Sequence, residues 1–116
     1  MSVKTIKRLR RHKKIRARMH GTKECPRLCV FRSNQHIYAQ LINDDDAKVL
    51  ISVSDKDVKA KKGEKKLDVS KDVGKMIAKK AMDEKIEKAI FDRGGFLFHG
   101  RIKAVAEGAR EQGLKF

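Results

Sequence analysis

The segment FDRGGFLFHG, residues 91–100, gathers residue types that can do chemistry. Asp92 and His99 have the side chains of an orienting acid and a catalytic base. The segment contains no Ser or Cys nucleophile and no second carboxylate for metal-assisted hydrolysis. A catalytic loop therefore stays open as one of the two weaker interpretations of this segment, beside nucleotide binding.

The same segment is also suited to binding phosphate or RNA. Glycines ahead of a helix can turn backbone N–H groups toward an anion, although the Lys-Ser/Thr ending of a nucleotide-binding P-loop is missing. Basic and imidazole groups can instead contact RNA phosphates and base edges, while a ring stacks on an unpaired base and glycines allow close approach. The alternative place for a ring is the hydrophobic core. For RNA, the residues are Arg93, His99, Arg101 and Lys103, with Phe96 or Phe98 as the ring and Gly94, Gly95 and Gly100 as the glycines.

Positive charge is concentrated at the N-terminus. The 116-residue chain has 30 Lys and Arg against 15 Asp and Glu, a net charge of +15. Residues 1–23 hold ten of the basic residues and no acidic one. Such an excess predicts a polyanionic partner. Because like charges repel and this segment has little apolar surface to bury, we expect residues 1–23 to be a flexible RNA-binding arm, disordered or transiently helical until a polyanion binds.

Residues 24–116 are expected to form one globular RNA-binding domain, since a chain of this size supports a single modest core. Runs 27–32, 36–42 and 49–54 combine β-branched or aromatic residues with alternating polarity, and turn-forming residues separate them. They predict three short antiparallel strands in a meander. The lysine-rich residues 55–68 are expected to be a solvated surface loop.

Two helices and a fourth strand are expected after this loop. An apolar stripe at four-residue spacing predicts a helix over 71–85, with Ser70 as its N-cap. Residues 88–92 predict a strand parallel to one of the meander. A second amphipathic helix follows Gly100 and stops at Gly113. The fold class is therefore α/β, a mixed sheet of three antiparallel meander strands plus one parallel strand, in the order β-β-β-α-β-α.

This order places residues 91–100 between the end of a parallel strand and the start of a helix, where open α/β sheets often bind ligands. Within the strand, Phe91 is expected in the core. Cys25 and Cys29 lack a second pair to complete a zinc site, although His20 and His36 are near in sequence, so we expect reduced thiols and no metal. The N-terminus lacks the apolar run of a signal peptide, and no stretch has membrane-spanning length, so a cytoplasmic location is expected.

Three segments resemble the bacterial family of ribosomal protein L18, the large-subunit protein that binds 5S rRNA. They are RSNQHIYAQLI (32–42), VGKMIAKKA (73–81) and FDRGGFLFHGRIKAVAEGAREQGLKF (91–116), and the basic run RLRRHKKIRAR extends the resemblance over nearly the whole chain. It implies a structural, non-enzymatic protein without cofactor or membrane contact, monomeric when free. Its expected place is the central protuberance, where it binds 5S rRNA, helps attach it to 23S rRNA, and touches neighbouring large-subunit proteins.

The resemblance also implies three sets of RNA contacts. An arm set binds phosphates by charge, a hairpin set offers amide, hydroxyl, imidazole and aromatic groups, and a loop set overlaps the segment discussed first. Phe98 ranks below His99 and Arg101 because the family commonly has a tyrosine there, whose hydroxyl is missing. The sets are Arg8, Arg10, Arg11, His12, Arg16 and Arg18; Arg32, Ser33, Asn34, His36 and Tyr38; and Arg93 through Arg101.

Overall fold

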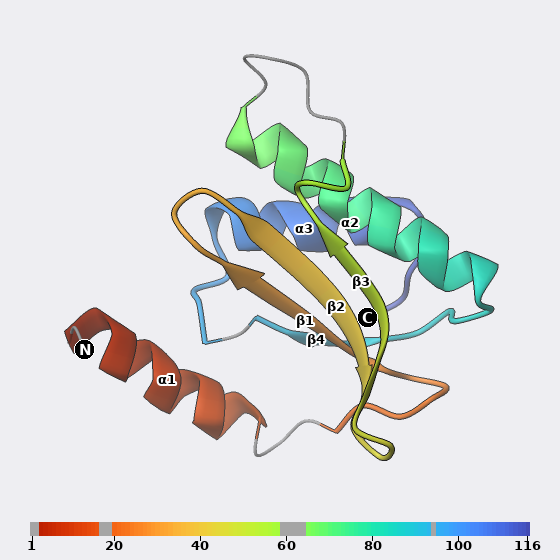
Figure 1. Cartoon of the computed structure of the whole chain (residues 1–116), viewed down its shortest axis with the longest axis horizontal. Coiled ribbons are helices and arrows are strands. Elements are labelled where there is room, and N and C mark those ends of the chain that lie inside the picture. Colours follow the sequence, from red (N-terminus) through yellow and green to blue (C-terminus); the bar gives the residue numbers. More distant parts are fainter. Residues whose placement is uncertain (1–2, 17–19, 59–64, 94) are drawn as a thin grey trace.

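A computed structural model describes residues 3–16, 20–58, 65–93 and 95–116, with the backbone alone at positions 12 and 14–16 (Figure 1). The strand and helix order predicted for the domain is confirmed, and a helix in the arm precedes it. The elements are α1 (Val3–Arg16), β1 (Arg27–Arg32), β2 (Ile37–Asn43), β3 (Lys48–Ser54), α2 (Lys66–Asp83), β4 (Ile90–Asp92) and α3 (Gly100–Glu111).

The four strands form one mixed sheet in the order β3-β2-β1-β4. β1 pairs with β2, and β2 with β3, in antiparallel register, with an irregularity between Leu41 and Ile42. β4 runs parallel to β1 and places Phe91 opposite Leu28. The predicted meander and its added parallel strand are therefore confirmed, and β4 ends beside the middle of β1.

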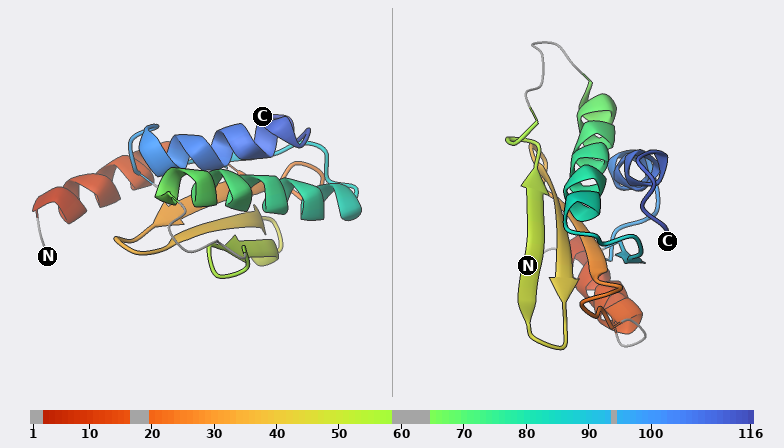
Figure 2. Two further views of the ribbon diagram at one scale, coloured as in Figure 1. Left: turned by 90° about the horizontal axis from the view of Figure 1, so that it is seen from above. Right: turned by 90° about the vertical axis from the view of Figure 1, so that its right-hand side faces the viewer.

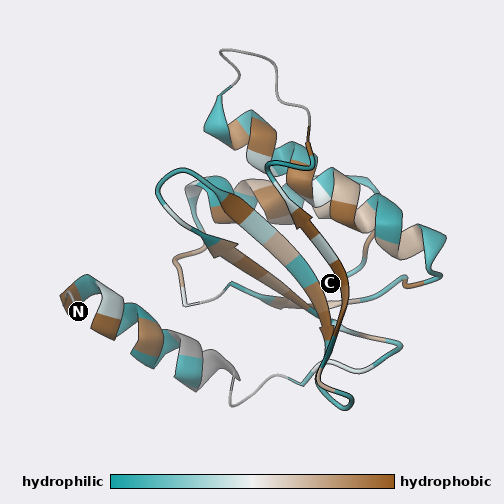
Figure 3. Cartoon of the chain, in the orientation of Figure 1, coloured by the Kyte–Doolittle hydropathy of each residue, from teal (hydrophilic) through white to brown (hydrophobic). Residues whose placement is uncertain are grey.

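Helices α2 and α3 cover one face of this sheet (Figure 2). Alternation along β1 explains which side chains they meet, because Leu28 and Val30 are fully buried whereas Phe31 is 46% exposed on the other face. Ile77 of α2 and Ile102 of α3 complete the core from the helix side. Figure 3 shows the corresponding hydrophobic bands on the strands and helices, against a mainly hydrophilic α1.

Helix α2 begins at Lys66, five residues before the predicted start, and ends at Asp83. Ser70 is therefore not its N-cap; the Ser70 hydroxyl instead donates to the Lys66 carbonyl, 2.8 Å away inside the helix. Lys66, Leu67 and Asp68 are exposed, so the first residues of α2 resemble the charged loop before them in the sequence, although Val69 lies four residues before Val73 and continues the apolar stripe. Among the described residues, no helix is both long and apolar enough to cross a membrane.

Two glycines lie where α2 and α3 pack together. A Cβ added at Gly74 would lie 2.0 Å from the Val105 carbonyl oxygen, and one at Gly108 would lie 2.1 Å from that of Lys71. Each glycine costs its helix about 1 kcal/mol of propensity relative to alanine. Without side chains at these two positions, the backbones of α2 and α3 can lie in direct contact. The two glycines therefore set the distance between the helices.

Gly108→Ala is expected to lower the free energy of unfolding by about 1–3 kcal/mol, because the new methyl group must push the helices apart. The steric cost of the new methyl group should therefore exceed the gain of about 1 kcal/mol in helix propensity that alanine brings. Urea unfolding followed by circular dichroism measures it. Glu107→Ala, at an exposed position of the same helix, should change stability by less than about 0.5 kcal/mol. A Gly108→Ala protein as stable as the parent would contradict the packing argument.

Candidate nucleic-acid interface

A buried ion pair fixes the point where the loop after β4 begins. The Arg27 Nη1 atom, at the start of β1, donates to Asp92 Oδ2 at 2.6 Å. The Asp92 side chain is fully buried and that of Arg27 is 4% exposed. Since the Asp92 carboxylate is engaged inside the domain while His99 is exposed, the geometry argues against the catalytic interpretation of these two residues.

The same arginine also holds the turn between β2 and β3. Its Nε and Nη2 atoms each donate to Asp44, both at 3.1 Å. Asp44 in turn accepts the Gly21 N–H at 2.7 Å, and the Gly21 carbonyl accepts the Asp44 N–H at 2.9 Å. Gly21 has no room for a Cβ, because that atom would lie 2.4 Å from the backbone nitrogen of Arg27. The segment that follows the arm is therefore attached to both the sheet and the turn.

Electrostatics at this cluster follow from its hydrogen bonds. Burial alone would lower the pKa of Arg27, but the bonds to Asp44 and Asp92 outweigh it and raise that pKa above its ordinary value. The hydrogen bond from Arg27 in turn lowers the pKa of Asp44, which burial opposes. Both groups therefore remain charged at neutral pH.

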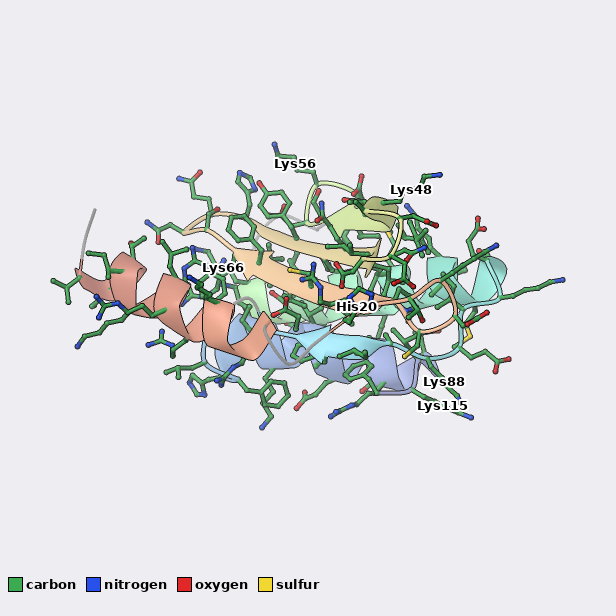
Figure 4. The ribbon with its side chains drawn as sticks, turned by 90° about the horizontal axis from the view of Figure 1, so that it is seen from below. His20, Lys48, Lys56, Lys66, Lys88 and Lys115 are labelled. Atoms are coloured by element: carbon green, nitrogen blue, oxygen red, sulfur yellow. The ribbon has the colours of Figure 1, made fainter. Side chains whose placement is uncertain are left out.

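Residues 3–16 of the arm form helix α1, which lies beside the loop and the sheet (Figures 1 and 4). Arg11 Nε donates to the Gly95 carbonyl at 3.1 Å. The Arg8 guanidinium carbon lies 4.6 Å from the centre of the Phe96 ring, and that of Arg32 lies 5.1 Å from it. Arginines and the loop therefore connect the arm to the domain.

The turn between β1 and β2 is held from two sides. Ser33 and His36 exchange hydrogen bonds within the turn. Arg101 Nη2, at the start of α3, donates to the Ser33 carbonyl at 2.9 Å, and Lys66 Nζ donates to that of Asn34 at 2.9 Å. Figure 4 places Lys66 toward this end of the sheet, with Lys48 at the other. Burial, followed by the nearby charge of Arg32, lowers the pKa of Arg101.

Aromatic side chains line the sheet face that α2 and α3 do not cover. The Phe31 and Tyr38 rings stack at 5.6 Å, Phe31 lies 6.3 Å from Phe96, and Tyr38 lies 6.3 Å from His36. The His36 ring also bonds to Asp55, with Nδ1 and Oδ2 3.0 Å apart. Phe31 was not among the predicted contacts, although its alternation with Leu28 and Val30 already placed it on this face.

The two loop phenylalanines have different surroundings. Phe96 is partly buried and packs against the core. Phe98 is 42% exposed and meets Phe91 edge-on at 5.7 Å. Phe91 is only partly buried, contrary to the expected core position, because β4 lies at the edge of the sheet, and its ring stacks on Phe116 at 5.4 Å.

Arm, turn and loop together enclose a groove of about 700 Å³. Among the lining residues that the structure describes, five are Lys or Arg and none is acidic. The four basic arm residues among them recur at i, i+3, i+4 and i+7, so this spacing in the sequence indicates the face once the arm is taken as a helix. The lining consists of Lys4, Thr5, Lys7, Arg8, Arg11, Arg32, Ser33, Asn34, Phe96, Leu97 and His99.

Other predicted contact residues lie away from the groove lining. Arg10 is exposed on α1, and Lys103 is exposed on α3, with its ammonium 3.9 Å from the Glu107 carboxylate. Arg93 is partly buried at the start of the loop, and Gly100 begins α3 with a φ of 58°. The side chains of His12 and Arg16, and all of Arg18 and Gly94, lie outside the described residues.

The cysteines do not assemble a metal site with the nearby histidines. Neither Cys25 nor Cys29 forms a disulfide. His20 is hydrogen-bonded to Asp45, which raises the pKa of His20. In the part of the chain that the structure describes, no three His, Cys, Asp or Glu side chains are grouped so that they could hold a metal ion.

Asp44→Asn is expected to lower the free energy of unfolding at neutral pH by about 1–3 kcal/mol, because it weakens charge-assisted hydrogen bonds to Arg27. Since folding lowers the pKa of Asp44, its charge contributes stability above the ordinary value of 3.8, and that contribution is lost as the pH falls through the lowered pKa. Urea unfolding across this acidic range should therefore show a shallower decline for the variant. Asp83→Asn, exposed at the end of α2, is the control and should retain the parent's pH profile.

Comparison with known proteins gives one consistent family. The family model described as ribosomal L18 of archaea, bacteria, mitochondria and chloroplast matches residues 2–116. The chain is 49% identical over 116 residues to the large ribosomal subunit protein uL18 of Thermotoga petrophila, covering 97% of this chain and 95% of the relative. It is 53% identical over 111 residues to the uL18 of Staphylococcus haemolyticus, covering 94% and 92% of the two chains.

Proposed function

The chain belongs to the ribosomal L18 family, and we propose that it is a structural constituent of the large ribosomal subunit that binds 5S rRNA and helps attach it to 23S rRNA in the central protuberance. The match over residues 2–116 confirms the family predicted from the sequence. In this role the protein acts without catalysis, in the cytoplasmic ribosome. Its other partners are neighbouring large-subunit proteins, and the free protein is a monomer.

The basic groove is the observation that carries this proposal. In the described part of the chain, five cationic side chains and no acidic one line a single cavity built from the arm, the turn and the loop. Phosphate groups of RNA are the natural ligands of such a lining, because each neutralised phosphate releases condensed counterions. The polar side chains of Ser33, Asn34 and His99 line the same groove and suit base edges and 2′-hydroxyls.

Residues outside the groove extend the proposed contact surface. Arg10 and Lys103 would add phosphate contacts on α1 and α3, and Tyr38 would offer a ring on the open sheet face. Arg101 contributes mainly by holding the turn, through its bond to Ser33. The family resemblance alone supports contacts by His12, Arg16, Arg18 and Gly94.

A competition experiment tests the function. The full chain is titrated with labelled 5S rRNA at physiological salt, against an unrelated structured RNA of similar length and against duplex DNA. A specific 5S rRNA protein should prefer its cognate RNA by about a hundredfold or more over both competitors. Equal competition by all three would instead indicate a non-specific polycation, and the proposal would fail.

Removing residues 1–19 should weaken binding to every RNA and flatten the dependence of log K on log salt. Each lost phosphate contact reduces the slope by roughly 0.7 to 0.9. Filter binding over a series of salt concentrations measures the slope. The double variant Lys79→Ala/Lys80→Ala removes two exposed charges from α2, away from the groove, and should leave it nearly unchanged. An unaltered slope after truncation would show that the arm does not contact phosphate.

A further inference from the structure

The turn between β1 and β2, residues 33–36, accepts two cationic side chains from the side of α2 and α3. Arg101 Nη2 donates to the Ser33 carbonyl, and Lys66 Nζ donates to the Asn34 carbonyl, both at 2.9 Å. Both donors belong to the first turns of their helices, which lie near this end of the sheet (Figure 1). The carbonyls of two consecutive peptide bonds therefore point toward the helices.

The orientation of these two peptide bonds also fixes their N–H groups. Both bonds are trans, and in a planar trans peptide the N–H points in the opposite direction to the carbonyl. The N–H groups of Asn34 and Gln35 therefore point away from the helices. Among the described residues, neither of these N–H groups has a hydrogen-bond acceptor, whereas those of Ser33 and His36 bond within the turn. Residues 33–35 are exposed, so a ligand can reach the turn.

The charge around the turn favours a phosphate oxygen as this ligand. Arg32, Lys66 and Arg101 bring three cations to the turn. Asp55, an acid in the cavity of about 180 Å³ on the helix side of the turn, is bonded to the ring of His36. A cation that binds a carbonyl also polarises the peptide, which strengthens its N–H as a donor. Backbone N–H groups are common ligands of nucleic-acid phosphates.

We propose that the N–H groups of Asn34 and Gln35 form a binding site for an RNA phosphate, and that Lys66 and Arg101 are positioning residues that orient it. The proposal rests on the RNA-binding function proposed above. Neither positioning residue needs to touch RNA, because each acts through the carbonyl that it binds. Lys66 was not among the predicted contacts, since its partner in the turn lies 32 positions earlier in the sequence.

Affinity for 5S rRNA provides the first test. Lys66→Met keeps the length of the side chain and removes the donor, so we expect it to weaken binding about three- to fivefold. The dependence of log K on log salt should stay unchanged, because Lys66 neutralises no phosphate itself. Lys66→Arg, which keeps a cationic donor, should retain the parent's affinity. Lys65→Met removes the same charge from the adjacent residue, whose side chain does not cap α2, and should change affinity less than about twofold.

Two results of these titrations would overturn the assignment of Lys66. A salt slope lowered by roughly 0.7 to 0.9 in Lys66→Met would mean that its ammonium contacts phosphate directly. Equal losses of affinity in Lys65→Met and Lys66→Met would mean that only the charge of this region matters.

The backbone amides of the turn provide the second test. In ¹H–¹⁵N spectra of the parent bound to 5S rRNA, the amide protons of Asn34 and Gln35 should shift downfield and exchange more slowly than in the free protein. These changes should be smaller in the double variant Lys66→Met/Arg101→Met and should persist in Lys65→Met. Amides of Asn34 and Gln35 that keep their free-protein shifts and exchange rates in the parent complex would overturn the phosphate site.

Spectra of the free protein separate the positioning role from RNA binding. Without RNA, Lys66→Met and Arg101→Met should each shift the amide signals of residues 33–36, whereas Lys65→Met should not. Unchanged signals in both Lys66→Met and Arg101→Met would overturn the positioning role. A parent protein without preference for 5S rRNA would instead refute the proposed function, and the free-protein spectra would still decide whether the two cations orient the turn.

Discussion

The arrangement of the whole interface depends on Arg27. Its guanidinium bonds Asp92, 65 positions away at the end of β4, and Asp44, 17 positions away in the turn between β2 and β3. The cost of removing such charges from water offsets much of their attraction, so the main consequence of the cluster is geometric. The cluster fixes the position of Asp92, where the loop begins after β4. Through the bond between Gly21 and Asp44 it also fixes the segment that joins the arm to β1.

Holding a cationic arm against a cationic groove requires attraction that does not cancel the charge. A carboxylate at the loop would bind Arg8 strongly, but it would neutralise a charge that RNA needs and repel phosphate. The loop offers a carbonyl oxygen at Gly95 and an aromatic face at Phe96 instead. Both attract guanidinium groups through partial charges, so the groove keeps its full positive charge.

Sequence patterns predicted those features that depend on neighbours along the chain. Alternation in residues 27–32 gave β1 with its bounds and its two faces, and the order of elements gave the parallel strand β4. Features that depend on distant partners were not visible. Asp92 resembled a catalytic acid because its partner Arg27 is 65 positions away in the sequence. The sequence shows Gly108 only as a residue of low helix propensity, because its contact with the backbone of α2 depends on a residue far along the chain.

Charge and recognition come from different parts of the chain. Among the described residues, four of the five groove cations, Lys4, Lys7, Arg8 and Arg11, belong to the arm, and Arg32 belongs to the domain. The polar side chains suited to base edges, those of Ser33, Asn34 and His99, all belong to the domain. A free arm would attract any polyanion, and an isolated domain would keep the polar groups but would lack the four arm cations of the groove. Because the arm lies against the loop, both sets of groups face the same cavity and can act on the same nucleotides.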